Sequence, residues 1–369
     1  MTRINPPALV ALADGTTFTG TRVGAEGEVF GEMVFNTSMT GYQEILTDPS
    51  YAGQMVCMTY PHIGNYGVNP EDDESEGPHV RAFLMKACCR RPSNHRATSG
   101  LVEYLQEHGV VGVEGIDTRE LTRRVRIHGA MNAAVSTRDL DPKSLTAKAR
   151  DWEGLVGVDL VRGVTCAEPY DCEPEGAPRF HVVAYDYGIK RSILRRLVAE
   201  GCRVTVVPAT TTADEALARE PDGIFLSNGP GDPRPLHYAI DTVRDLVERA
   251  DRPIFGICLG HEILGLALGA EIYKLKFGHR GANQPIEEGD SGRILITSEN
   301  HGWGIRGDSI PDALEVTRRN LNDGCVEGMH HRELPVFSIQ CHPEASPGPH
   351  DSYHLFGYFA DLMSRRRAA

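Results

Sequence analysis

The sequence has 369 residues, of which 40% are hydrophobic and 24% charged, the composition of an ordinary folded protein rather than of a disordered chain. Asp and Glu number 51 against 38 Lys and Arg, so the formal net charge is −13, and a nucleic-acid-binding surface is not expected. No stretch approaches about 18 consecutive apolar residues, so no membrane-spanning helix is expected.

The nine cysteines are scattered along the chain, and none forms the Cys-x-x-Cys pair of zinc ribbons or thioredoxin-like sites. The first residues contain no long apolar segment of the kind that a secretory signal has. We therefore expect a cytoplasmic protein with reduced thiols.

The first part of the chain contains short apolar runs separated by turn residues. We expect strands over residues 8–12, 16–21 and 33–36, and helices over residues 102–108 and 118–125. Asp117 or Thr118 would cap the second helix. This mixture predicts a smaller α+β domain over residues 1–165.

Residues 166–179 interrupt this pattern. The segment holds three prolines and four acidic residues, which disfavour both a helix and a central strand. We interpret it as a linker between two domains.

Strands and helices alternate regularly in residues 180–369. Expected strands cover residues 182–185, 204–207, 223–226 and 254–257, and expected helices cover residues 190–200, 213–219, 239–250 and 263–268. Such alternation is typical of an α/β domain with a mostly parallel sheet flanked by helices. Further β-like segments follow at residues 293–297, 314–318 and 336–340.

A cysteine stands at the turn between the fourth of these strands and the helix after it. Residues 256–260 read Gly-Ile-Cys-Leu-Gly, the strand–turn–helix setting of a nucleophile elbow with Cys258 as the nucleophile. The helix N-terminus favours a thiolate, and the N–H of Leu259 is suited to stabilise an oxyanion. The alternative is that Cys258 is one more buried cysteine.

A candidate base follows the last expected strand. Residues 341–344 read Cys-His-Pro-Glu, and on an extended backbone His342 and Glu344 point to the same side. A cysteine nucleophile needs a base, and the base needs a group that orients it, so Cys258, His342 and Glu344 fit as a catalytic triad. Taken singly, each of these residues also fits an ordinary core or surface position.

The loop after the third strand reads Ser-Asn-Gly-Pro-Gly-Asp-Pro over residues 227–233. The chain has no Gly-Lys pair, which excludes a Walker A motif, and no third glycine completes a dinucleotide-binding motif. We interpret the segment as a tight loop facing Cys258, with the N–H of Gly231 as a second oxyanion donor. A plain turn is the alternative.

Two groups of residues have side chains of metal-binding types. His330 and His331 are adjacent, and Cys341 precedes His342. Neighbouring residues on a strand point to opposite faces, so we expect no metal site from either group.

The three motifs, in this order, resemble those of class I, triad-type glutamine amidotransferases over residues 180–369. Further stretches resemble the small, glutamine-hydrolysing subunits of carbamoyl-phosphate synthetases, and they lie at residues 35–51, 59–65, 116–119, 277–285 and 342–351. The similarity runs nearly from end to end.

This resemblance implies a function. Such subunits hydrolyse L-glutamine through a thioester and channel ammonia to a large ATP-dependent subunit, which makes carbamoyl phosphate for arginine and pyrimidine biosynthesis. It further implies that residues 1–165 dock on the large subunit, that ATP and Mg or Mn bind to that partner, and that this chain needs no cofactor. By motif match, the glutamine contacts fall on Ser50, Gly229, Gly231, Leu259, Glu262, Asn300, Gly302 and Trp303.

Three positions depart from the family pattern, which usually has Gln at Glu262 and Glu299 and Phe at Trp303. Gln offers a hydrogen-bond donor and an ionised Glu does not. Glu262 is therefore either protonated by burial or bonded only to donors of the substrate and backbone.

Two other functions are open, namely another class I glutaminase and a non-catalytic subunit with the same fold. The motifs of the first half argue against the former. The intact Cys258, His342 and Glu344 argue against the latter.

Overall fold

The computed structural model describes residues 6–249, 251–289 and 291–368. Two compact units divide between Val156 and Gly157, earlier than the predicted boundary after residue 165. The segment predicted as a linker belongs to the second unit, because its residues Tyr170–Cys172 form an edge strand, β10, that pairs with the neighbouring strand. Cys166 and Cys172 also pack against that unit's core.

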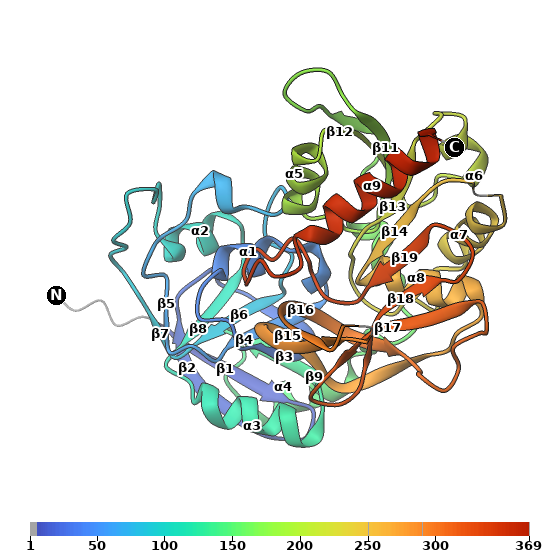
Figure 1. The fold of residues 1–369 in the computed structure, drawn as a ribbon. Helices are drawn as coiled ribbons and strands as arrows, with labels where there is room; N and C mark the ends of the chain where they lie inside the picture. Colours follow the sequence, from blue (N-terminus) through green and yellow to red (C-terminus); the bar gives the residue numbers. More distant parts are fainter. Residues whose placement is uncertain (1–5, 250, 290, 369) are drawn as a thin grey trace. The chain divides into compact units, whose positions relative to one another are not determined.

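The first unit is built on a closed sheet (Figure 1). The strand order is β1 (Pro7–Leu12), β2 (Thr17–Arg22), β8 (Val111–Glu114), β6 (Ala82–Met85), β4 (Gln54–Met58), β3 (Glu28–Asn36) and β9 (Met131–Ser136), which pairs back with β1. A separate short pair joins β5 (His62–Ile63) and β7 (Ala87–Cys88). The sequence predicted β1, β2 and part of β3, because these carry the clearest apolar runs.

Helices surround this sheet. They are α1 (Tyr42–Thr47), α2 (Leu101–Glu107), α3 (Thr118–His128) and α4 (Pro142–Asp151), with 3₁₀ turns at Pro49–Tyr51 and Pro70–Asp72. The side chain of Asp117 caps α3 by accepting a hydrogen bond from the N–H of Glu120 at 2.9 Å.

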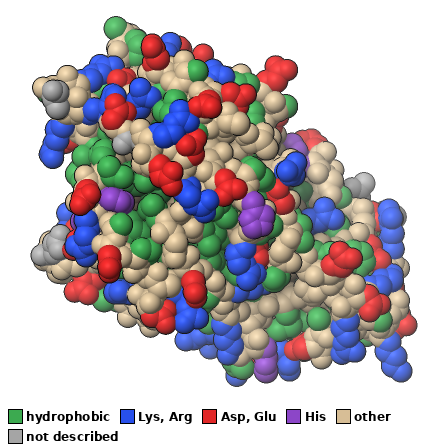
Figure 2. Space-filling model, turned by 90° about the vertical axis from the view of Figure 1, so that its right-hand side faces the viewer, with side chains coloured by type: hydrophobic (Ala, Val, Ile, Leu, Met, Phe, Trp, Pro, Cys, Tyr) green, Lys and Arg blue, Asp and Glu red, His purple; other side chains and the backbone are tan. Residues whose placement is uncertain are grey.

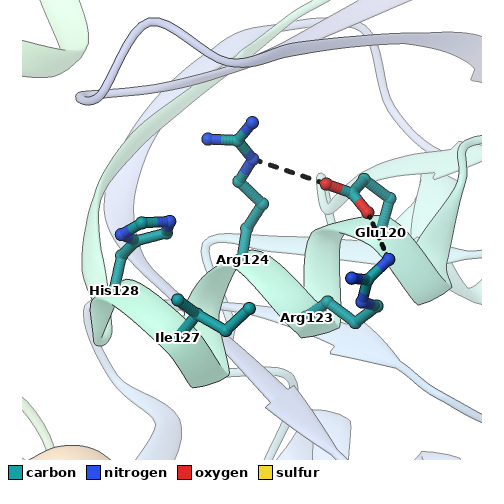
Figure 3. A pocket seen from close by; sticks show the side chains of 5 residues that line it. All are labelled: Glu120, Arg123, Arg124, Ile127 and His128. Carbon is teal, nitrogen blue, oxygen red and sulfur yellow. Dashed lines mark hydrogen bonds and ion pairs between the residues drawn. The ribbon is translucent and has the colours of Figure 1, made fainter.

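Helix α3 buries Leu121 and Val125. Its outer side holds a shallow hollow of about 200 Å³ (Figure 3), whose lining consists of Glu120, Arg123, Arg124, Ile127 and His128. Both arginines pair with Glu120 there, so one positive charge remains in excess on this helix face.

The second unit contains one long sheet. The order is β10, β12 (Cys202–Pro208), β11 (Phe180–Asp186), β13 (Gly223–Leu226), β14 (Ile254–Ile257), β19 (Val336–Ile339), β18 (Val326–His331), β17 (Leu314–Asn320), β15 (Ile272–Glu288) and β16 (Arg293–Ile305). The strands from β12 to β19 are parallel, and those from β18 to β16 pair antiparallel. The predicted strands are present, whereas β15 was not predicted and β16 extends well beyond the predicted 293–297.

Two apolar layers cover the parallel part of this sheet. Side chains of α5 (Arg191–Ala199) and α9 (His354–Ala368) pack on one face, together with Phe225 and Phe255. Those of α6 (Ala213–Leu217), α7 (His237–Arg249) and α8 (Leu259–Leu268) pack on the other, together with Ile224 and Ile254. Because consecutive strand residues face opposite layers, both faces are buried. Because β13, β14 and β19 are parallel neighbours, their carboxyl ends lie at the same edge of the sheet.

No helix in the described ranges is long and apolar enough to cross a membrane. On the face drawn in Figure 2, Lys and Arg side chains are interspersed with those of Asp and Glu. Although the net charge of the chain is negative, this face carries both positively and negatively charged side chains.

Candidate active site

Cys258 occupies the sharp turn between β14 and α8. Its backbone has φ 53° and ψ −108°, a conformation that residues other than glycine rarely adopt. The N–H of Cys258 donates to the carbonyl of Ile339 at 2.9 Å, and its Sγ lies 3.7 Å from the carbonyl oxygen of Asn300. Cys258 thus contacts the end of β19 through its backbone and the middle of β16 through its thiol.

The two glycines of this turn are required by close backbone contacts. A Cβ added to Gly256 would lie 2.8 Å from the carbonyl oxygen of Gly260. One added to Gly260 would lie 2.3 Å from the carbonyl oxygen of Leu226 on β13. Any larger residue at either position would therefore force strand, turn and helix apart.

His342 and Glu344 follow β19, the parallel neighbour of β14. His342 Nδ1 lies 2.7 Å from Glu344 Oε1, so Nδ1–H donates to the carboxylate. His342 Nε2 is buried without a hydrogen-bond partner in the described part of the chain. In the neutral ring this nitrogen is the basic one.

The pairing of these two residues arises differently from the prediction. An extended backbone was expected, but the chain turns here, and the N–H of Ala345 donates to the carbonyl of His342 at 3.0 Å. The turn rather than strand alternation brings the carboxylate under the imidazole.

Lys190 completes this arrangement from the loop between β11 and α5. Its Nζ lies 3.0 Å from Glu344 Oε1 and also donates to the carbonyls of Ala345 and Ser346 at 2.8 and 3.0 Å. Burial raises the pKa of Glu344, but the charges of Lys190 and His342 outweigh it and lower that pKa to about 2. Glu344 is therefore ionised at neutral pH.

The loop over residues 227–233 contacts the cysteine turn. The N–H of Gly260 donates to the carbonyl of Ser227 at 2.9 Å. Gly231 has φ +84°, and a Cβ on Gly229 would lie 2.2 Å from the carbonyl oxygen of Tyr187. Leu259 is the first residue of α8, so its N–H has no acceptor one turn earlier in the helix.

Comparison with known proteins identifies the family. Residues 10–135 match the family described as carbamoyl-phosphate synthase small chain, CPSase domain, and residues 183–362 match glutamine amidotransferase class-I. The protein named "Carbamoyl phosphate synthase small chain" of Syntrophotalea carbinolica is 57% identical over 98% of each chain. Proteins of the same name from Chlorobaculum tepidum and Synechocystis sp. are 55% and 51% identical, over 97% and 98% of this chain and 98% and 97% of theirs.

The chain belongs to the carbamoyl phosphate synthase small chain family. The resemblance of the sequence motifs and the predicted α/β class are thereby confirmed. The roles of individual residues stay predictions.

Glu262, where the carbamoyl phosphate synthase small chain family usually has Gln, is buried one turn into α8. Gln340 Nε2 donates to Glu262 Oε1 at 3.1 Å. Burial raises the pKa of Glu262 to about 8, although the bond from Gln340 opposes this. The protonated form is thus favoured at neutral pH, which is one of the two states expected from the sequence.

The other predicted glutamine contacts lie in both units. Asn300, Gly302 and Trp303 belong to β16, and the guanidinium of Arg234 lies 4.3 Å from the centre of the Trp303 ring. Ser50 belongs to a 3₁₀ turn of the first unit, where its N–H donates to Asp48.

Sequence reasoning missed two residues of this region. Lys190 was predicted only as the start of a helix, and it lies four residues after the end of β11. Gln340 was read only as the end of a strand. It also missed a second cluster, formed by His279, Glu299, His301 and Glu327.

Proposed function

We propose that this chain is the glutaminase subunit of a glutamine-dependent carbamoyl-phosphate synthetase. The observation that carries the proposal is the buried Glu344–His342 pair, which follows the strand next to the one that ends at Cys258. Family membership supports the same activity.

In the proposed reaction, His342 Nε2 takes the thiol proton and the Cys258 thiolate attacks the side-chain amide carbon of glutamine. A C–S bond forms, and the carbonyl oxygen becomes an oxyanion that accepts hydrogen bonds from the N–H groups of Leu259 and Gly231. His342 then returns the proton to the amide nitrogen, the C–N bond breaks and ammonia leaves. A water, deprotonated by His342, hydrolyses the thioester to glutamate and restores the thiol.

Glu344 and Lys190 act on the histidine rather than on the substrate. The ionised carboxylate fixes the tautomer with its proton on Nδ1 and stabilises the imidazolium that forms. Lys190 keeps this carboxylate charged, and its hydrogen bond to the carbonyl of Ala345 stabilises the turn after Glu344.

The glutamine contacts are proposed from the resemblance of the sequence motifs. The proposed contacts are Ser50, Gly229, Gly231, Leu259, Glu262, Asn300, Gly302 and Trp303. A protonated Glu262 supplies a donor that the usual Gln supplies from its amide.

The proposed partner is a large ATP-dependent subunit that uses the ammonia. We place its docking site on the first unit, since that unit contains the stretches 35–51, 59–65 and 116–119 that resemble those of small subunits. On this proposal ATP and Mg or Mn belong to the partner, and glutamine hydrolysis by Cys258 uses no cofactor of this chain.

The test measures glutamate release by the purified chain with and without its co-expressed partner, and carbamoyl phosphate formation from glutamine, bicarbonate and ATP. A glutamine-analogue electrophile should alkylate Cys258 and stop glutamate release. Absence of glutaminase activity even with the partner would identify a non-catalytic subunit. Activity that the partner does not stimulate would identify a stand-alone glutaminase.

A further inference from the structure

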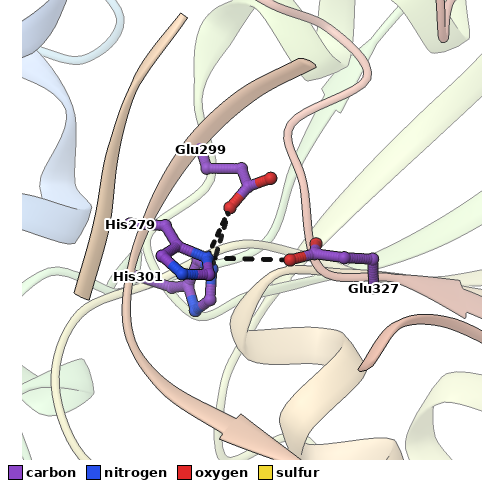
Figure 4. Close-up of side chains that lie close together, drawn as sticks. All are labelled: His279, Glu299, His301 and Glu327. Carbon is purple, nitrogen blue, oxygen red and sulfur yellow. Dashed lines mark hydrogen bonds and ion pairs between the residues drawn. The ribbon is translucent and has the colours of Figure 1, made fainter. Parts of the chain in front are cut away.

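A second buried cluster joins three strands of the second unit (Figure 4). His279 comes from β15, Glu299 and His301 from β16, and Glu327 from β18. One possible ligand atom from each residue lies within 4.8 Å of all the others. None of these four residues has a role in the proposed glutaminase reaction.

The distances between these atoms are within about 0.4 Å of those expected around a small metal ion. His279 Nδ1 lies 2.9 Å from Glu299 Oε2 and 3.7 Å from Glu327 Oε1, and His301 Nε2 lies 3.2 Å from Glu299 Oε2. A tetrahedral site with bonds of about 2.0–2.2 Å separates its ligand atoms by about 3.3–3.6 Å. The observed separations lie on both sides of this range.

The remaining nitrogen of each histidine is held from outside the cluster. His279 Nε2 bonds to Asp323 Oδ2 at 2.9 Å, and His301 Nδ1 bonds to the carbonyl of Trp303 at 2.6 Å. Metal-bound histidines in proteins almost always donate their other N–H to a carboxylate or a backbone carbonyl. In a neutral ring these bonds keep the proton on the outer nitrogen, so His279 Nδ1 and His301 Nε2, which are directed into the cluster (Figure 4), are the nitrogens that a metal would bind in place of a proton.

One oxygen of the Glu299 carboxylate is also held by hydrogen bonds from outside the cluster. Glu299 Oε1 accepts from Thr297 Oγ1 at 3.2 Å and Asn320 Nδ2 at 3.4 Å, which leaves Oε2 for the centre. Although His279 Nδ1 is close to Glu299, it has no properly directed hydrogen bond from or to any described residue, and neither has Glu327 Oε2. Buried polar atoms without partners are rare and call for a ligand.

We propose that His279 Nδ1, His301 Nε2, Glu299 and Glu327 bind one divalent transition-metal ion of the zinc type. Two carboxylates balance the two charges of the ion, and two neutral imidazoles complete a tetrahedral set. Four protein ligands leave no open position, so the ion is structural.

The ion would fix the part of β16 that borders the cysteine. Glu299 and His301 share one face of the strand, and the backbone carbonyl of Asn300 between them lies 3.7 Å from Cys258 Sγ. A metal bound to both neighbours would thus fix the backbone segment that contacts Cys258.

The experiment uses the untagged full-length chain together with its partner subunit. The protein is stripped with a chelator, reloaded with Zn²⁺ or Co²⁺, and analysed for bound metal by elemental analysis. We expect one equivalent per chain, intense visible absorption of tetrahedral Co²⁺, and a higher melting temperature with Zn²⁺ than without it.

Variants then locate the ion. Glu299→Gln keeps the size of the side chain and removes the anionic ligand, so it should weaken Zn²⁺ binding at least about 100-fold, and Asp323→Asn should weaken it about 10- to 100-fold. Glu287→Gln makes the same change at an exposed position of β15 and should bind like the wild type.

Either of two results overturns the proposal. One is a wild-type protein that takes up less than one equivalent or gives no tetrahedral Co²⁺ spectrum, which means that the cluster is a metal-free ion-pair network. The other is equal Zn²⁺ affinity of the wild type and Glu299→Gln, which means that the ion binds elsewhere. The wild-type measurement stands even where a variant fails to fold.

Discussion

Two histidine–carboxylate clusters in the second unit use the same residue types differently. At the end of β19, one imidazole is oriented by one carboxylate, and its second nitrogen is left without a partner among the described residues. In the cluster between β15, β16 and β18, Asp323 and the carbonyl of Trp303 orient the two imidazoles from outside. The second nitrogen of each ring points toward the carboxylate of Glu299. A single imidazole nitrogen without a partner among the described residues suits proton transfer, whereas several converging lone pairs suit an ion. The groups that orient a histidine therefore decide what it can do.

The largest effect that separates the clusters is expected from Cys258→Ala. Removing the nucleophile should lower glutamate release by at least about 10⁴-fold, since the thioester cannot form. The metal content should stay at the wild-type value, because this residue supplies no ligand of the other cluster.

The matched control is Cys89→Ala, at a half-buried cysteine of the first unit. It should keep its glutaminase activity. Equal losses in both variants would contradict the role given to Cys258.

Lys190→Met tests the cation that distinguishes the first cluster. Removing one partner of a buried ion pair leaves Glu344 charged and unpaired, so unfolding should become easier by about 3–5 kcal/mol, measured by denaturant titration. The double variant Lys190→Met, Glu344→Gln should recover part of this loss. A double variant no more stable than the single one would show that the pair itself is not the cause.

The pH dependence of this pair has a definite sign. The pKa of Glu344 is lowered to about 2, so its contribution to stability is present above its ordinary value near 4.5 and is lost as the pH falls through about 2. Glu344→Gln should lack this acid-induced loss, whereas the wild type should show it in unfolding measurements between pH 5 and pH 2.

Glu262 is a third buried carboxyl, in contact with an amide rather than a cation. Its raised pKa of about 8 means that stability is full below about pH 4.5 and declines as the pH rises to about 8. If the protonated form binds glutamine, KM should rise about fivefold between pH 8 and pH 9 as that form is lost. Glu262→Gln should remove both trends, and coinciding pH profiles of the two proteins would exclude a role for protonation.

The smallest effect is expected from Trp303→Phe. Residue 303 is a predicted glutamine contact, and its carbonyl also orients a histidine of the second cluster. The carbonyl of residue 303 orients His301 and is unchanged by the substitution, so metal binding should be unaffected. The weaker stacking with Arg234 should cost about 0.5–1 kcal/mol, a two- to fivefold rise in the KM for glutamine. A large loss of Zn²⁺ affinity would show that the ring, and not only the backbone, supports the second cluster.

The sequence predicted best what is local. Cys258 and Gly260 lie in one short segment at a strand–helix junction, and the apolar runs of β11, β13 and β14 are uninterrupted because both sheet faces are buried. The first unit was harder to predict, since β4, β6 and β8 are separated by irregular segments and pair with strands distant in the sequence.

The second cluster depends on long-range pairing. His279 meets His301 only because β15 and β16 pair in a register interrupted by bulges, and Glu327 arrives through β17 and β18. Neither register follows from the spacing of single residues. The local sequence signal for this cluster was the spacing of Glu299 and His301, two residues apart on one strand. No local sequence signal indicated that Lys190 pairs with Glu344.

The packing around Cys258 divides the site into fixed and adjustable parts. Gly256 and Gly260 bring the backbones of β14, α8 and β13 into direct contact, which leaves no room for the turn at Cys258 to shift on its own. At Gly231, by contrast, the atoms nearest to an added Cβ belong to the side chain of Leu160, the first of them 3.0 Å away, and not to backbone. If Gly231 is the second oxyanion donor, as proposed, its position can therefore change by the movement of a side chain, whereas Cys258 can move only together with the backbone around it.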